Sequence, residues 1–112
     1  MVQGIYLSVR ASFTDKKTAD EYATWVSAPG GPVDRVLHTF ARKAWVMIED
    51  PTKGDPTHRV ITNYGFPSRA ELSAYGGSIT AADLRREGEQ FFGEQAVSRG
   101  TVTRTTGEVF SR

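Results

Sequence analysis

Alternation of apolar and polar residues predicts four β-strands along the chain. In the first, Ile5, Leu7 and Val9 share one face, and the residues between them share the other. The second is rich in aromatic and β-branched residues, and the prolines and glycine of 50–56 then predict an exposed hairpin loop. The predicted strands are 5–10, 40–49, 57–66 and 97–110, the last with Gly100 or Gly107 as a candidate bulge.

Helical periodicity separates the first two strands. Apolar residues recur at i, i+3, i+4 and i+7 over 16–27, which predicts a helix that Thr14 and Asp15 cap. The apolar stripe comprises Ala19, Tyr22, Ala23 and Val26. A Pro-Gly-Gly-Pro segment at 29–32 must end this helix. A short helical turn over 33–38 follows.

A second helical region separates the last two strands. A Ser-x-x-Glu capping box at 68–71 predicts a short helix over 69–75, which two glycines end. A weaker cap at 80–83 opens a longer helix that runs to about residue 95. The residues expected near its buried side are Leu84, Gly88, Phe91 and Phe92.

The order β-α-β-β-α-β is typical of one ferredoxin-like α+β domain, residues 1–112. Such a domain has a four-stranded antiparallel sheet with both helices on one face. A chain of this length buries only roughly two-thirds of its unfolded surface. We therefore expect the helix-free face to be covered by an identical subunit, which makes the protein a homodimer.

Composition excludes several function classes. Lysine and arginine total 14 and aspartate and glutamate total 13, so the net charge of +1 argues against nucleic-acid binding. Cysteine is absent, which excludes disulfides, thiolate metal sites and a cysteine nucleophile. No signal peptide is apparent, and the longest apolar run, 44–48, is far shorter than the roughly 20 residues of a membrane span. We expect a cytoplasmic protein without membrane contact.

No sequence motif indicates a metal or a cofactor. Histidines, aspartates and glutamates lack metal-ligand spacing, and the Pro-Gly-Gly-Pro segment lacks the lysine and glycine spacing of a phosphate loop. We therefore expect no metal, no cofactor and a small-molecule substrate.

Several features are shared with a known family. They are Gly-Ile-Tyr-Leu at 4–7, Glu-Tyr-Ala-Thr-Trp at 21–25, Pro32 seven residues after that tryptophan, the hairpin, Gly88 with Gly93, and the Thr/Arg-rich last strand. In these features the chain resembles the dimeric α/β-barrel superfamily, and most of all its EthD-like branch of small bacterial proteins.

The resemblance covers nearly the whole chain. It implies two sheets packed face to face across a two-fold axis, with a ligand cavity in each subunit between sheet and helices. Members of the family include cofactor-independent cyclases, isomerases, lyases and monooxygenases, haem-degrading enzymes, and proteins with no known reaction. One departure matters, because many relatives carry an aspartate and a histidine after the tryptophan where this chain has Ser27 and Gly30.

The candidate general base is His38. Asp34 precedes it by four residues, a spacing that orients an imidazole on a helix. The alternative is a histidine at a helix end that only contacts free carbonyl groups. His58, at the start of the third strand, is a candidate substrate contact or a solvent-exposed residue.

Tyrosine hydroxyls are the candidate hydrogen-bond donors to a substrate oxygen. Tyr6 and Tyr64 lie on the first and third strands, which are central neighbours in this topology. The alternative is that both tyrosines only fill the core. The residues predicted to line the substrate site or the core beside it are Trp25, Trp45, Phe91 and Phe92. Arg42 and Arg104 are expected to hold a substrate carboxylate or to pair with a neighbouring acid.

Three functions remain open. The first is a cofactor-independent isomerase, cyclase or lyase that acts by acid–base chemistry on a small, partly apolar, aromatic or oxygenated compound. The second is a non-catalytic ligand-binding or accessory protein. The third is a cofactor-free monooxygenase. In each case the segment 27–32 is expected to form a mobile part of the cavity rim.

Overall fold

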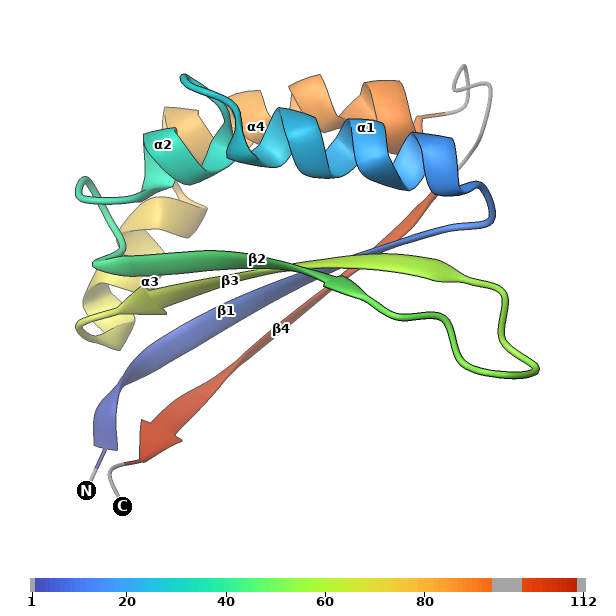
Figure 1. Ribbon diagram of the computed structural model, residues 1–112. Helices are drawn as coiled ribbons and strands as arrows, with labels where there is room; N and C mark the ends of the chain where they lie inside the picture. The colour runs from blue at the N-terminus through green and yellow to red at the C-terminus, as the bar shows by residue number, and fades with distance from the viewer. Residues whose placement is uncertain (1, 94–99, 111–112) are drawn as a thin grey trace.

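One antiparallel sheet organises the molecule (Figure 1). The computed structural model describes residues 2–93 and 100–110. The strands are β1 (Val2–Phe13), β2 (Lys43–Glu49), β3 (His58–Phe66) and β4 (Thr101–Phe110). Their order is β2-β3-β1-β4, with β1 and β3 in the centre. This order and the alternation of strands and helices confirm the predicted ferredoxin-like fold.

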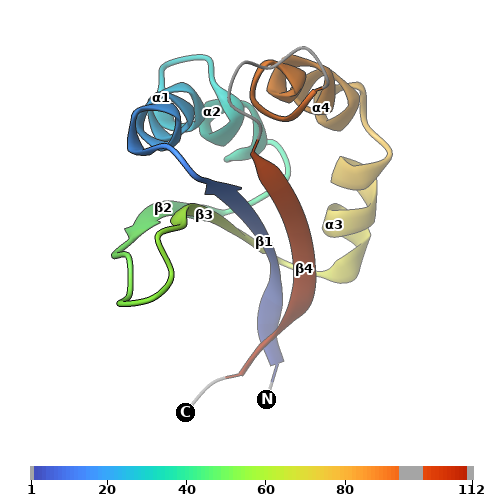
Figure 2. The same cartoon turned by 90° about the vertical axis from the view of Figure 1, so that its right-hand side faces the viewer.

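The helices lie on one face of the sheet. They are α1 (Lys16–Ser27), α2 (Pro32–Val36), α3 (Arg69–Gly76) and α4 (Ile79–Phe92). Figure 2 shows α1 and α2 toward the β2 and β3 side, and α3 and α4 toward the β4 side. No helix in the described part of the chain is both long and apolar enough to cross a membrane.

The helix caps explain where the helices begin. The side chain of Asp15 accepts from the backbone N–H groups of Lys17 and Thr18, so α1 has the predicted boundaries. The cap of α4 is Ser78, whose hydroxyl accepts from Ala81 N–H at 3.1 Å. The expected cap at 80–83 is therefore wrong, because these residues already form the first turn. α4 ends at Phe92, because Gly93 is already extended, so the predicted helix end near 95 is too late. The predicted strand start at 97 falls outside the described residues.

β1 and β2 differ most clearly from their predicted bounds. β1 is longer than 5–10, because it pairs along its length with β3 on one side and β4 on the other. β2 begins at Lys43 rather than at residue 40, because residues 37–42 form a turn. There the N–H groups of Phe40 and Ala41 both donate to Val36 O, and His38 has a φ of 71°.

The strand register decides which side chains face the helices. Leu7 pairs with Tyr64 and Thr106, and Val9 pairs with Thr62 and Arg104. Successive side chains of a strand alternate between the two faces of the sheet. These two cross-strand rows lie on the helix-covered face. The neighbouring row of Trp45, Asn63, Ser8 and Thr105 lies on the helix-free face.

The hydrophobic core consists of two clusters on the helix-covered face. The first comprises Ala11, Phe13, Ala19, Tyr22, Ala23, Val26, Val60 and Phe91. The second comprises Ile5, Leu7, Val36, Ala41, Tyr64, Phe66 and Leu84. Aromatic rings dominate the first cluster, in which Tyr22 contacts Phe13, Phe91 and Trp25 at centroid separations of 5.4, 5.2 and 5.7 Å. Tyr22 and Tyr64, one from each cluster, both reach the space between them.

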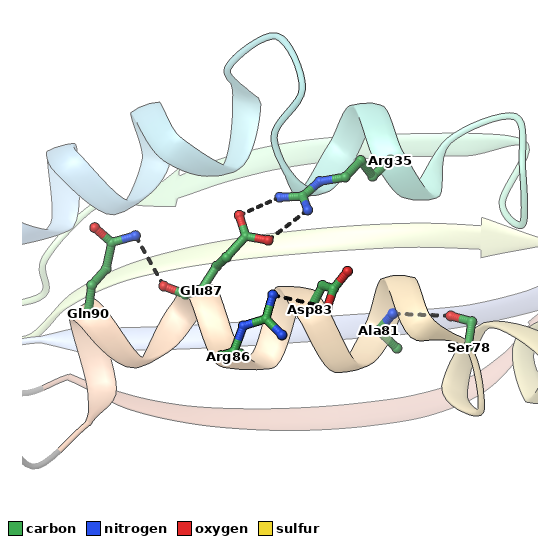
Figure 3. A network of polar contacts seen from close by, with 7 residues as sticks. All are labelled: Arg35, Ser78, Ala81, Asp83, Arg86, Glu87 and Gln90. Carbon is green, nitrogen blue, oxygen red and sulfur yellow. Dashed lines mark hydrogen bonds and ion pairs between the residues drawn. The ribbon is translucent and has the colours of Figure 1, made fainter.

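An ion pair joins α2 to α4 (Figure 3). Both terminal nitrogens of Arg35 donate to the carboxylate of Glu87 at 2.7 Å, which is the bidentate geometry of a strong pair. Hydrogen bonding to Arg35 holds the pKa of the Glu87 carboxyl below its ordinary value of 4.5. The pair therefore holds α2 against α4.

This pair should make stability depend on pH in the acid range. A lowered folded-state pKa contributes stability above the ordinary pKa, and that contribution is lost as pH falls through the folded value. We expect Glu87→Gln to melt at a lower temperature than the wild type at pH 7. The difference in melting temperature between the two proteins should disappear as the pH falls below about 4.5, the ordinary glutamate pKa. Circular-dichroism melts from pH 3 to pH 7 check this.

The control is Asp83→Asn, which removes the exposed pair with Arg86 on the same helix. Exposed ion pairs contribute little, so this variant should differ little from the wild type at every pH. A Glu87→Gln gap that is the same at pH 3 and pH 7 would contradict the role given to the Arg35–Glu87 pair.

Candidate functional site

A cavity of about 560 Å³ lies between the sheet and the helices. Its floor is formed by β1, β3 and β4 and its roof by α1, α3 and α4. The floor residues are Leu7, Val9, Thr62, Tyr64, Val102, Arg104 and Thr106. The roof residues include Tyr22, Trp25, Val26, Leu72, Tyr75, Leu84, Arg85, Gly88, Glu89 and Phe92. Its size is that of a small-molecule site.

Aromatic residues form much of the roof. Trp25 from α1 and Phe92 from α4 both contact Tyr22. Gly88 lies beneath them, and a Cβ at this position would stand 3.7 Å from Cη2 of Trp25. The absence of a side chain at Gly88 therefore leaves space for a ligand beside the indole ring.

Three tyrosines supply the polar groups of the interior. Burial raises the pKa of Tyr22 to about 12 and also raises those of Tyr64 and Tyr75. All three side chains line the same cavity, and in this sense they form one cluster. Raised pKa values keep these groups protonated at neutral pH, so they are hydrogen-bond donors rather than bases.

Charged side chains mark the mouth of the cavity. Arg104 on β4 and Arg85 and Glu89 on α4 line it, and all three are exposed. The mouth therefore lies between β4 and α4. The positive charge of Arg104 counteracts the upward pKa shifts of Tyr22 and Tyr75, so the guanidinium is electrostatically coupled to both phenols. Two cations and one anion give the mouth a net positive charge.

The tyrosine cluster should make the protein sensitive to alkali. A folded-state pKa above the ordinary value of 10.0 contributes stability that is fully present below pH 10 and is lost as pH rises through the folded value. For Tyr22 we expect a loss of up to about 3 kcal/mol by pH 12. Tyr22→Phe should show a smaller fall in melting temperature between pH 9 and pH 11.5 than the wild type. An equal fall in both proteins would contradict the burial of this hydroxyl.

Four of the sequence-predicted residues line the cavity. They come from β3, α1, α4 and β4 and are Tyr64, Trp25, Phe92 and Arg104. The structure therefore brings together one predicted donor, two aromatic wall residues and one of the two candidate arginines.

His38 and Asp34 do not form the expected pair. The carboxylate of Asp34 accepts from Gly30 N–H at 2.8 Å instead. α2 ends at Val36 and His38 has left-handed backbone geometry, so the i,i+4 spacing of a continuous helix does not apply. His38 is exposed and does not line the cavity. The expectation that His38 shares a cavity with a tyrosine hydroxyl is therefore wrong.

Tyr6 and Trp45 lie on the helix-free face. Tyr6 pairs with Gly65, so it faces away from Tyr64 on the adjacent position of β3. Its ring lies over Gly107, where a Cβ would stand 2.5 Å from Cε1 of the tyrosine. Trp45 is 47% exposed. Neither residue contributes to the cavity.

The other predicted contacts also lie outside the cavity. Phe91 is buried in the first core cluster, and of the two predicted phenylalanines only Phe92 lines the cavity. Arg42 is exposed in the turn before β2. His58 begins β3 opposite Phe13, well away from Tyr64 along the strand. The catalytic or binding roles predicted for these residues thus gain no support from their placement.

Sequence reasoning missed several lining residues. The sequence places Tyr22 in the apolar stripe of the first helix and Tyr75 at the end of the short helix 69–75. Thr62 lies within the predicted strand 57–66, and no role is predicted for it. The position of Thr62 could have been predicted from the sequence, because it lies two residues before Tyr64 and shares its face of the strand. Nothing local distinguished Arg85 and Glu89 from other charged residues of an exposed helix face.

The segment 27–32 contributes Pro32 to the cavity lining. The turn is held by Gly31 N–H, which donates to Ala28 O at 2.8 Å, and by the bond from Gly30 to Asp34. Gly30 has a φ of 76°, which a valine would adopt only with strain. A valine there would therefore reduce stability, and mobility of the segment stays a prediction.

Possible metal ligands are dispersed. Across residues 2–93 and 100–110, no three histidine, aspartate or glutamate side chains gather where a metal ion would be held.

The comparisons with known proteins support the fold. The sequence matches no protein-family model, and no curated protein matches it. Among solved structures, a Bacillus cereus protein provisionally designated an antibiotic biosynthesis monooxygenase is similar, with a TM-score of 0.67 and 9% identity over 97% of this chain and 96% of its own. A dimeric ferredoxin-like protein from an uncultured marine organism has a TM-score of 0.67 and 10% identity over 96% of each chain.

A third similar structure is an ethyl tert-butyl ether D (EthD) family protein from Bacillus halodurans. Its TM-score is 0.60 at 14% identity, over 94% of this chain and 99% of its own. At these identities the likeness shows the ferredoxin-like fold alone, which the resemblance in sequence had implied.

Proposed function

We propose that the protein is a cofactor-independent enzyme of the isomerase, cyclase or lyase type. Its substrate is a small, partly aromatic compound with an enolisable carbonyl group. The observation that carries the proposal is the cluster of three protonated tyrosines in an aromatic cavity. Neutral donors in a dry site stabilise an oxygen that becomes negatively charged during reaction.

Proton abstraction also requires a base. Among the described residues that line the cavity, Glu89 is the only carboxylate, and none is a histidine. Glu89 is exposed at the mouth, four residues after Arg85 on the same helix. In this mechanism Glu89 takes a proton from the carbon next to the carbonyl, and a tyrosine hydroxyl donates to the resulting enolate oxygen.

Hydrogen–deuterium exchange tests the proposal without knowledge of the natural substrate. The purified protein is incubated in D₂O with 2-indanone or phenylpyruvate, and loss of the proton signal next to the carbonyl is followed by NMR. We expect exchange faster than in buffer for at least one of them. Exchange at the buffer rate for both ketones would contradict the proposal and favour a ligand-binding protein.

A second candidate is a cofactor-free monooxygenase. The interior presents hydroxyl groups and no carboxylate among its described residues, which suits the binding of a phenolate. An electron-rich phenolate can itself reduce oxygen, and one structural neighbour carries a monooxygenase designation. Oxygen consumption with a hydroquinone separates this candidate from the first.

We also propose that the protein is a homodimer through the helix-free face of its sheet. Trp45 and Met47 are 47% and 46% exposed there, and they are adjacent on one face of β2. Exposed large apolar side chains on the face that no helix covers are typical of an interface. Two neighbours of this fold are described as dimeric ferredoxin-like proteins.

A further inference from the structure

The hydroxyl of Thr62 has no hydrogen-bond partner among the described residues. Thr62 lines the cavity floor and is only 1% exposed, and its Oγ1 makes no hydrogen bond to the described residues. A buried hydroxyl without a partner costs stability, so such a group in a native protein requires an explanation. A ligand that brings an oxygen to this end of the cavity supplies the missing hydrogen bond.

Thr62 and Arg104 flank Val9 in one cross-strand row and form the two ends of the part of that row that lines the cavity. Thr62 on β3 pairs with Val9 on β1, which pairs with Arg104 on β4. Adjacent strands lie about 4.8 Å apart, so the backbones of Thr62 and Arg104 are separated by about 10 Å. In the next row Leu7 separates Tyr64 from Thr106 in the same way. The floor is thus polar at both ends and apolar in the middle.

The β4 end of this row is cationic. Arg104 and Arg85 both line the mouth, and neither forms an ion pair within residues 2–93 and 100–110. Both side chains are exposed and line the same cavity, one from β4 and one from α4. Guanidinium groups bind carboxylates strongly and with defined geometry.

We propose that the ligand is a small aromatic carboxylate with a hydroxyl group at its opposite end and its enolisable carbonyl beside the carboxylate, on the side of Glu89. Arg104 binds the carboxylate at the mouth, with Arg85 nearby. Thr62 and Tyr64 bind the distal oxygen, and the ring lies over Val9 and Leu7. This inference rests on the proposed function of the same cavity and adds the class and the orientation of its substrate.

Calorimetric titration with three probes tests this arrangement. The first, 3-(4-hydroxyphenyl)propanoate, carries both polar ends. The second, 3-phenylpropanoate, lacks the hydroxyl, and the third, 4-(3-hydroxypropyl)phenol, lacks the carboxylate. We expect the first probe to bind most tightly to the full-length wild-type protein.

Two variants test which residue binds each end of the ligand. Arg104→Gln should weaken both carboxylate probes about 10- to 100-fold and leave the phenol alcohol unchanged. Thr62→Val should weaken the two hydroxylated probes about 2- to 10-fold and leave 3-phenylpropanoate unchanged. Thr62→Val should also raise the melting temperature, because it removes a buried hydroxyl that has no partner.

Ser8→Ala is the matched control. Ser8 also has a buried hydroxyl without a partner, but it lies on the helix-free face, opposite Asn63. Its removal should raise the melting temperature and leave all three affinities unchanged.

Equal binding of the phenol alcohol and the hydroxy acid, or unchanged carboxylate binding by Arg104→Gln, would overturn the inference. Unchanged binding of all probes by Thr62→Val would do the same. If no probe binds while 2-indanone still undergoes catalysed exchange, this inference fails and the proposed function stands. If no probe binds and neither ketone undergoes exchange, both fail.

Discussion

Glu89→Gln should lower the rate of catalysed deuterium exchange by about 10²- to 10⁴-fold, which is the usual contribution of a general base. The amide has nearly the same shape as the carboxylate, so the cavity keeps its size and its tyrosine donors. The affinity for a ketone should therefore change little while kcat falls. Exchange kinetics at several ketone concentrations separate the two effects.

The control is Glu87→Gln, the same substitution two residues earlier on α4. Glu87 pairs with Arg35 and does not line the cavity. It should keep the wild-type exchange rate when measured well below its melting temperature. Wild-type exchange by Glu89→Gln would remove Glu89 as the base. Exchange lost equally in both variants would indicate a structural effect on α4.

Met47→Glu should convert the proposed dimer into a monomer. The side chain is about half exposed in one subunit, so a charge costs the isolated fold little. In a face-to-face dimer the same charge would be buried without a partner, which is strongly unfavourable. Sedimentation should give twice 12.3 kDa for the wild type and 12.3 kDa for the variant.

Ile79→Glu is the control for the interface. Ile79 is 80% exposed at the start of α4, on the helix-covered side, so this variant should stay dimeric. The expected interface buries more than about 1,000 Å². A monomeric wild type at micromolar concentration would contradict the dimer, and a dimeric Met47→Glu would contradict the face assigned to it.

The local elements follow from sequence for physical reasons. The stripe of Ala19, Tyr22 and Val26 defines a helix because residues three and four apart share one helix face. The cap at Asp15 and the proline–glycine segment at 29–32 then set its two ends. The order of elements alone restricts the topology to the ferredoxin-like arrangement, because short connections allow few alternatives.

Strand register and turn geometry decide which residues line the site. A shift of one position moves a strand side chain to the other face of the sheet. Tyr6 and Tyr64 both lie on central strands, yet the pairing of Tyr6 with Gly65 places them on opposite faces. Likewise, the left-handed backbone at His38 removes it from the helix that was to align it with Asp34.

The sequence alone determined the order of elements, the caps at Asp15 and Ser68 and the hairpin, because each depends on near neighbours in the chain. A cavity between sheet and helices was implied only by the resemblance to a family. The sequence did not determine that Thr62, Tyr75 and Arg104 meet in one site. Thr62 and Arg104 share a row only through their common partner Val9, and Tyr75 reaches them only because α3 packs beside that row. Such convergence is set by long-range pairing and packing, which no local pattern of residues encodes.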